Sequence, residues 1–155
     1  MIVHRIDKAR RAGSAFTGEG ARIAGGRWNP VGVPMVYCSA SLALAALEVF
    51  VHLSYEGWHI SFVSFRIDIP DRVKVDAAAP LPRNWREEPP GMPTQEVGYK
   101  WMRGGASAAL MVPSAIVPSE FNVLLNPAHR DFQSITMGKP EPFSFDPRMW
   151  KADAR

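Results

Sequence analysis

The sequence predicts an α+β fold, with a mixed or mainly antiparallel central sheet and flanking helices. Residues 60–69, ISFVSFRIDI, alternate with period two, which is typical of a strand with one buried face. Residues 42–53, LALAALEVFVHL, are apolar on nearly every side, as expected of a helix packed on a sheet. The 155 residues contain no internal repeat and no linker of domain scale. We therefore expect one domain over residues 1–155.

The first half of the chain carries β-branched and apolar stretches separated by glycine and proline. The apolar run at 42–53 follows Ser39 and Ser41, either of which is a suitable N-cap for a helix. The glycine-rich residues 13–20 predict a loop. The elements expected in this half are strands at 2–6, 35–38 and 60–69, a helix at 41–53, and an extension of the sheet at 73–75.

The second half alternates loops with short apolar strands. Prolines crowd residues 80–93 around Trp85 and exclude regular structure beyond a helical turn. Thr94 is the expected N-cap of a helix that runs through Trp101 and is closed by Gly104 and Gly105. With strands at 108–112, 121–125 and 143–150, the last at a sheet edge, the sheet has roughly six to eight strands in all.

Composition excludes several classes of protein. The four histidines lack ligand spacing and Cys38 is the single cysteine, so no zinc or other metal site and no disulfide framework is expected. No signal segment or membrane span is recognisable, which predicts a cytoplasmic location and no membrane partner. The net charge of +3 permits an anionic substrate. The basic residues are dispersed, so no direct nucleic-acid contact is expected.

The unusual chemistry lies in residues 25–52, GGRWNPVGVPMVYCSASLALAALEVFVH. A paired glycine precedes Arg27, a short strand ends near Tyr37, and Glu48 lies in the apolar helix. A carboxylate in so apolar a helix needs either a partner or a solvent-filled cleft, because an unpaired ion in the core is costly. Glu48 is therefore either a site residue or the wet edge of the helix.

Three common nucleotide and hydrolase motifs are absent. The glycines at 18, 20 and 25 do not have dinucleotide-fingerprint spacing. Gly138 and Lys139 precede a proline where an NTPase phosphate loop has serine or threonine. Residues 105–109 lack the second glycine of a nucleophile elbow. A Rossmann domain, a P-loop NTPase and a serine hydrolase are all disfavoured.

The same segment, together with LPRNWREEPP, TQEVGYKWM and LMVPSAIVPSEFNVLLNPAHRDF, resembles the RES domain family, named for its Arg, Glu and Ser. The resemblance runs from about residue 3 to residue 146, and the segments occur in the family's order. Carried over to this chain, the family's Arg is Arg27, its Tyr is Tyr37, its Glu is Glu48 and its Ser is Ser114. Asn122 is a weaker carry-over.

The resemblance implies a toxin of the Xre/RES toxin–antitoxin type, with a fold similar to ADP-ribosyltransferase toxins. Such toxins consume NAD by phosphorolysis or hydrolysis, or use it to ADP-ribosylate a protein. The implied acceptor is inorganic phosphate, water or a target protein, and no metal takes part. The implied partner is an antitoxin with a helix-turn-helix domain. A catalytically silent binding module is the alternative from a different class.

The chemistry of the carried-over residues fits NAD cleavage. A carboxylate near the ribose stabilises an oxocarbenium-like sugar, which is the role expected of Glu48. Arg27 is expected to bind the pyrophosphate, Tyr37 to stack on nicotinamide or sugar, and Ser114 to bond ribose or phosphate. The structural alternatives are an ion pair between Arg27 and Glu48, a core position for Tyr37 and a turn hydroxyl for Ser114.

Overall fold

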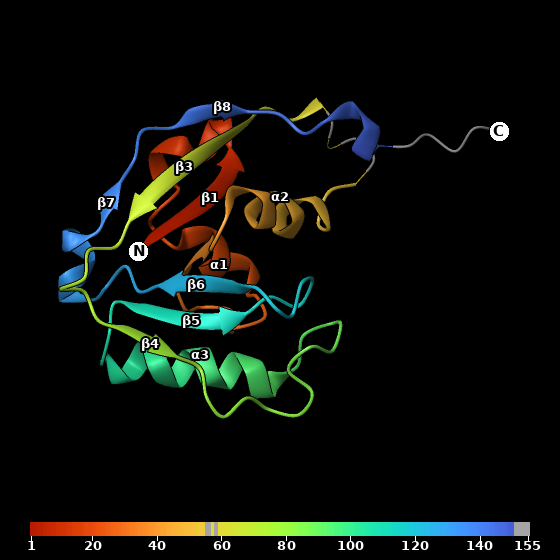
Figure 1. Cartoon of the computed structure of the whole chain (residues 1–155). Coiled ribbons are helices and arrows are strands. Elements are labelled where there is room, and N and C mark those ends of the chain that lie inside the picture. Colours follow the sequence, from red (N-terminus) through yellow and green to blue (C-terminus); the bar gives the residue numbers. More distant parts are fainter. Residues whose placement is uncertain (55–56, 58, 151–155) are drawn as a thin grey trace.

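The computed structural model describes residues 1–54, 57 and 59–150, and their strands form one eight-stranded sheet (Figure 1). The strand order is β4-β5-β6-β2-β1-β3-β7, and β8 also pairs with β3. The β4–β5 pair is parallel and all other pairs are antiparallel. The strands are β1 Ile2–Lys8, β2 Val36–Ser39, β3 Phe62–Asp68, β4 Val75–Ala77, β5 Ala109–Pro113, β6 Phe121–Leu125, β7 Thr136–Met137 and β8 Glu141–Phe143.

The helices pack on different parts of the sheet. The α-helices are α1 Glu19–Ala24, α2 Leu42–Phe50 and α3 Met92–Gly104. Short 3₁₀ turns occupy Ala9–Ser14, Arg130–Ser134 and Pro147–Met149. In Figure 1, α3 lies beside β4 and β5, whereas α2 lies on the side of β1. The predicted α+β fold with a mixed sheet is confirmed.

The two faces of the sheet carry different cores. One face holds a continuous cluster that includes Val3, Cys38 and Val123. On the other face, the apolar residues fall into two separate clusters. The first contains Trp28, Leu110 and Leu124 and packs against Trp101 of α3, and the second contains Ile6, Phe62 and Phe145 and packs against α2.

A polar row crosses the strands on the same face as these two clusters. Arg66 of β3 pairs with His4 of β1, His4 pairs with Ser39 of β2, and Ser39 pairs with Asn122 of β6. Directly opposed residues of antiparallel strands point to the same face of a sheet. The row therefore runs across four strands on one face, and Asn122 at its β6 end contacts Glu48 of α2.

Several element boundaries differ from those expected. The helix expected at 41–53 begins as expected after the Ser41 cap, whose side chain accepts a hydrogen bond from the Leu44 amide, but it ends at Phe50. The Thr94 N-cap is wrong, because α3 begins at Met92 behind Gly91. Pro93 fits the first turn, which has no need of its amide, and Thr94 donates its hydroxyl to the Gly91 carbonyl.

The C-terminal edge strand expected at 143–150 is also wrong. The edge strand is β8, at Glu141–Phe143, and Pro147 opens a 3₁₀ turn. The Phe145 ring causes this change, because it makes edge-to-face contacts with Phe62 and Trp150 at centroid distances of 5.3 and 5.5 Å. The chain must bend inward to bury that ring, so it leaves the sheet.

Candidate active site

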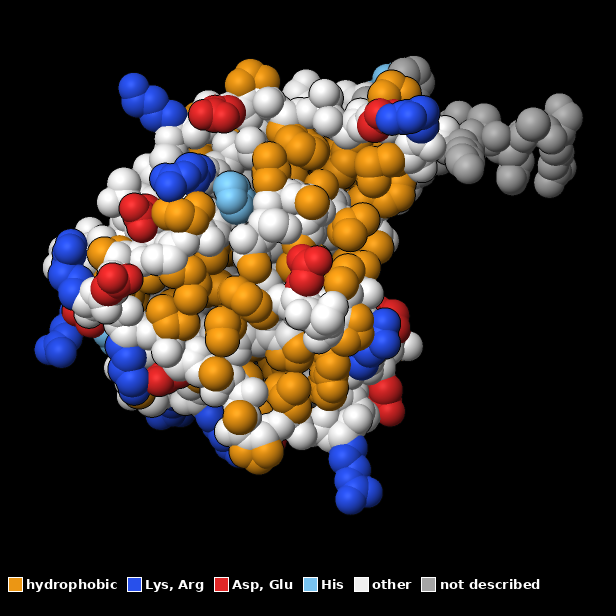
Figure 2. All heavy atoms as spheres, in the orientation of Figure 1, with side chains coloured by type: hydrophobic (Ala, Val, Ile, Leu, Met, Phe, Trp, Pro, Cys, Tyr) orange, Lys and Arg blue, Asp and Glu red, His pale blue; other side chains and the backbone are white. Residues whose placement is uncertain are grey.

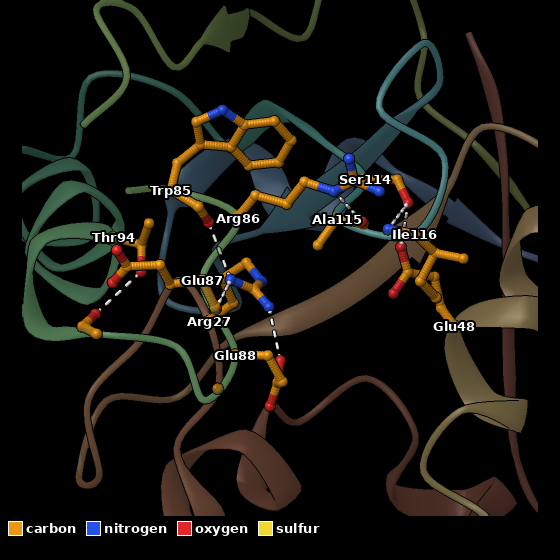
Figure 3. A network of polar contacts seen from close by, with 12 residues as sticks. Arg27, Glu48, Trp85, Arg86, Glu87, Glu88, Thr94, Ser114, Ala115 and Ile116 are labelled. Carbon is orange, nitrogen blue, oxygen red and sulfur yellow. Dashed lines mark hydrogen bonds and ion pairs between the residues drawn. The ribbon is translucent and has the colours of Figure 1, made fainter. Parts of the chain in front are cut away.

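The Glu48 carboxylate lies at the centre of a hydrogen-bonded network formed by α2, β6 and the turn after β5 (Figure 3). Its Oε1 accepts a hydrogen bond from Ser114 Oγ at 2.8 Å and one from Asn122 Nδ2 at 2.6 Å. Asn122 Oδ1 accepts from Ser39 Oγ at 2.7 Å, which orients the amide so that its NH₂ faces the carboxylate. Glu48 Oε2 has no hydrogen bond to any described residue and is available to a ligand.

Glu48 owes its position to a short helix with one buried side. Leu44 and Ala45 of α2 are buried against the sheet, and Ser41 caps the helix. Glu48 follows one turn after Leu44 and is half-buried, with its carboxylate directed to the polar row. The helix is apolar enough to be anchored without the glutamate, so the carboxylate is not needed to hold α2 in place.

Ser114 is both a turn residue and a partner of the carboxylate. Its buried Oγ accepts hydrogen bonds from the amides of Ile116 and Val117, at 3.1 and 3.0 Å. The same hydroxyl donates to Glu48. The two acceptor bonds leave the hydroxyl proton for the carboxylate, so the turn fixes the direction of the Ser114–Glu48 bond.

Tyr37 lies on β2 and binds the loop that carries Arg27. Its hydroxyl donates to Asn29 Oδ1 at 2.7 Å and accepts from the Trp28 amide at 3.1 Å. Burial raises the pKa of Tyr37 well above its ordinary value, so the phenol stays protonated. A Cβ on Gly26 would lie 2.7 Å from this hydroxyl, which explains why a glycine is needed at that position.

Arg27 binds the proline-rich loop rather than Glu48. Its Nη1 donates to the carbonyls of Trp85 and Glu87 at 2.9 and 2.7 Å, and its Nη2 forms a 2.8 Å ion pair with Glu88. The Arg27 side chain is 14% exposed and that of Glu88 is 72% exposed. The alternative of an Arg27–Glu48 ion pair is therefore not observed.

The structure thus divides the predicted residues into two groups. Glu48, Ser114 and Asn122 contact one another directly. Arg27 and Tyr37 hold the neighbouring loop. Figure 3 shows that both Arg27 and Glu48 belong to the same region, with the side chain of Arg86 between the Arg27 loop contacts and Ser114.

Sequence reasoning missed Arg86 and Ser39. Arg86 Nε donates to the Ala115 carbonyl at 2.8 Å, which joins the proline-rich loop to the turn that holds Glu48. Ser39 orients Asn122 from the neighbouring strand. The basic Arg86 beside Trp85 in a proline-rich loop was the available signal, whereas Ser39 was considered only as a helix cap. Within the described residues, no group of three or more His, Cys, Asp or Glu side chains is arranged to hold a metal ion.

Fold and site together define a small α+β domain with a hydrogen-bonded carboxylate beside a polar row, on the sheet face that also carries two apolar clusters. The family model for the RES domain matches residues 2–146. This chain belongs to the RES domain family. Among the described residues, no helix has the length and apolar character needed to cross a bilayer.

Three bacterial toxins are similar to this chain over most of its length. "Toxin Res" of Yersinia enterocolitica is 38% identical over 151 residues, which are 96% of this chain and 99% of that protein. "Toxin Res" of Photorhabdus laumondii is 40% identical over 154 residues, 98% and 99% of the two chains. The "Prs ADP-ribosylating toxin" of a Sphingobium species is 43% identical over 138 residues, 86% of each chain.

The fold is also found in a solved structure. A chain of the M. tuberculosis MbcT–MbcA toxin–antitoxin complex matches with a TM-score of 0.74 and 19% identity, covering 96% of this chain and 86% of that chain. At this identity, the likeness establishes the shared fold. It is consistent with the α+β architecture predicted from the sequence.

Proposed function

We propose that this chain is the toxin of a toxin–antitoxin pair and an enzyme that cleaves NAD at the nicotinamide–ribose bond. The carboxylate of Glu48 carries the proposal, because one oxygen is held by two neutral donors while the other has no partner among the described residues. The ADP-ribosylating activity named for the Sphingobium relative supports NAD as the substrate.

In the proposed reaction, the C–N bond between ribose and nicotinamide breaks and its electron pair leaves with the nicotinamide nitrogen. The positive charge moves from the pyridinium to the ribosyl group, where an adjacent carboxylate stabilises it. The acceptor oxygen then bonds to the anomeric carbon and gives up its proton. Glu48 Oε2 is the atom expected to face the ribose, since Oε1 is engaged by Ser114 and Asn122.

The acceptor defines two candidate reactions. Transfer to phosphate or water gives NAD phosphorolysis or hydrolysis, and transfer to a protein side chain gives mono-ADP-ribosylation. The name of the Sphingobium relative favours the second. Tyr37 is expected to present its ring to nicotinamide or sugar while its hydroxyl holds the loop, and Ser114 and Asn122 are expected to line the ribose subsite.

The proposed protein partner is an antitoxin of the Xre type, with a helix-turn-helix domain. The toxin–antitoxin complex formed by the structural neighbour supports a protein partner. Near Glu48, α2 exposes the apolar side chains of Leu42 and Leu47, and its C-cap Val51 is exposed too. Figure 2 shows apolar side chains gathered around a carboxylate over α2. A partner that covers this face would also cover Glu48.

A product analysis tests the proposal. The purified chain is incubated with NAD, with and without phosphate and with and without cell extract, and the products are identified by mass spectrometry. Released nicotinamide, together with ADP-ribose, a phosphorylated ADP-ribose or a modified protein, identifies the acceptor. Intact NAD in every condition would reject the enzyme and favour a non-catalytic binding module.

A further inference from the structure

A negatively charged phosphate of the substrate is best bound by a basic side chain that is not already paired with an acidic group of the protein. This inference rests on the proposed function, in which the substrate carries a pyrophosphate with two negative charges. Arg27 was the expected partner for that group. In the structure, Arg27 is paired with Glu88, and its Nη1 is bonded to two carbonyls. Binding a pyrophosphate there would require breaking contacts that the protein already makes.

Arg86 meets the requirement better. Its side chain is exposed and makes one hydrogen bond, from Nε to the Ala115 carbonyl at 2.8 Å. Its two terminal nitrogens have no hydrogen bond or ion pair to any described residue. A guanidinium held through Nε keeps two parallel N–H donors for a bidentate contact, which is the geometry that phosphate oxygens accept.

The anchor of Arg86 places it at the site. Ala115 directly follows Ser114, whose hydroxyl donates to Glu48. Arg86 and Glu48 are therefore bonded to adjacent residues of one turn. Figure 3 shows the Arg86 side chain running from the proline-rich loop to this turn. A ligand with its ribose at Glu48 would have its phosphates within reach of the Arg86 guanidinium.

Arg27 holds the backbone on both sides of Arg86. The two carbonyls bound by Arg27 Nη1 belong to Trp85 and Glu87, the residues that flank Arg86. This clamp fixes the backbone from which the Arg86 side chain extends. Tyr37, through the Trp28 amide, and Gln95 of α3, through the Gly26 carbonyl at 3.1 Å, fix the Arg27 loop in turn.

We propose that Arg86 binds a phosphate group of the substrates and that Arg27 acts as a positioning residue for it. Two molecules could supply the phosphate group: NAD, through its pyrophosphate, and inorganic phosphate, as the acceptor. The Arg86 fork suits either source. The same arrangement explains why Arg27, which is largely buried, binds main-chain carbonyls at the edge of a site proposed to take an anionic substrate.

The first test compares Arg86→Gln with Arg83→Gln. Arg83 lies in the same loop, is exposed, and has no hydrogen bond or ion pair to a described residue, so its substitution makes the same change of charge. Arg86→Gln should raise about tenfold the KM of the substrate whose phosphate Arg86 binds, either NAD or inorganic phosphate, the effect of losing one charged hydrogen-bonded contact, with kcat within about threefold. Arg83→Gln should change KM less than about twofold. Arg86→Lys should recover part of the loss.

The second test separates positioning from direct binding. A lysine presents its donors from one nitrogen and not from the two nitrogens that Arg27 uses, so Arg27→Lys should weaken the hold on the two carbonyls and raise the same KM as Arg86→Gln does. The double variant should be no worse than either single one, because both remove the same contact. Glu88→Gln leaves the two carbonyl bonds in place and should change KM less than about twofold. Multiplied effects in the double variant would overturn the positioning role of Arg27.

The third test identifies the source of the phosphate. In phosphate-free buffer, a raised KM for NAD assigns Arg86 to the pyrophosphate. A raised KM for inorganic phosphate, with NAD hydrolysis unchanged, assigns it to the acceptor. Either result supports the proposal. Equal behaviour of Arg86→Gln and Arg83→Gln in both arms, with unchanged melting temperatures, would overturn it. Wild-type protein that leaves NAD intact would instead reject the proposed function itself.

Discussion

At the scale of single residues, the site depends on the unequal environments of the two oxygens of Glu48. Ser114 and Asn122 both donate to Oε1, and both are uncharged. Neutral donors hold the carboxylate without offsetting its negative charge. An arginine partner would offset that charge. The proposed role of this carboxylate is to stabilise a developing cation.

Glu48→Gln should abolish NAD consumption while leaving the fold intact. The amide keeps the size of the side chain but removes the charge that stabilises the ribosyl cation. A loss of about two to four powers of ten in kcat is expected. NAD turnover is measured by nicotinamide release, with the melting temperature as the control. If the variant consumed NAD within threefold of the wild-type rate, Glu48 would be only a solvent-facing residue of α2 with no catalytic role.

Asn122→Asp should lower activity at neutral pH and shift its dependence on pH. The substitution places a second carboxyl where Asn122 Nδ2 now lies 2.6 Å from Glu48. Two carboxyls this close share a proton, which raises the higher apparent pKa of the pair. Activity that requires ionised Glu48 should therefore recover as the pH rises above that pKa. The measurement is a profile of kcat against pH.

Ser39→Ala is the control for that substitution. It removes the hydroxyl that orients Asn122 but adds no charge, so it should reduce activity without moving the pH profile. If the Asn122→Asp profile coincided with that of wild type, the contact between Asn122 and Glu48 would have no part in the chemistry.

At the scale of elements, the decisive contact is between α3 and the Arg27 loop. Gly98 of α3 is buried, and a Cβ at that position would overlap the Trp28 carbonyl oxygen. Trp28 directly follows Arg27 in the loop. The close approach of α3 to Trp28 therefore fixes how far the Arg27 loop lies from the helix. Glycine is required here because of backbone contact and not because of an unusual φ angle.

Gly98→Ala should destabilise the protein and lower its activity together. Relief of the overlap requires α3 or the Arg27 loop to move, at a cost of about 1–3 kcal/mol. For a chain of this size, that cost corresponds to a fall of roughly 2–12 °C in melting temperature. Differential scanning calorimetry and the NAD assay provide the two measurements.

Gly104→Ala is the matched control in the same helix. Gly104 is the last residue of α3, and a Cβ there would meet nothing within 4 Å. Alanine is the better helix former, so the melting temperature should be unchanged or slightly higher. Equal effects at positions 98 and 104 would contradict the proposed close contact.

At the scale of the whole molecule, the chain combines a net charge of +3 with exposed apolar residues on α2 beside the site. An active NAD-consuming enzyme must be held inactive in its own cell. A tightly bound acidic partner that covers the site is expected, because opposite charge speeds association and apolar contact stabilises the complex.

Expression of the chain without its partner should stop growth and lower cellular NAD. The Glu48→Gln variant, expressed to the same level, should be harmless if the toxicity comes from catalysis. Growth curves and NAD content of the two cultures provide the measurement. Harmless high-level expression of an active wild-type protein, with no neighbouring gene present, would reject the toxin proposal.

The sequence by itself determined the features that depend on residues close together along the chain. Local signals predicted a cap at Ser39 or Ser41, of which the structure uses Ser41, an end of α3 at Gly104 and Gly105, and β6 at residues 121–125. Periodicity predicted β3, although it begins two residues later than expected. The likeness to the RES domain family selected Glu48, Ser114 and Asn122, which meet in the structure.

Tertiary structure decided what the site residues contact. Arg27 meets residues 58 to 61 positions further along the chain, and Ser39 meets Asn122 at a separation of 83. No periodicity or spacing encodes such pairs, because they depend on how the sheet and loops close. Arg27 was therefore expected at the pyrophosphate, whereas packing directs it to the carbonyls that flank Arg86. The sequence identified the chemical groups, and the closure of distant segments decided which of them remain open to a ligand.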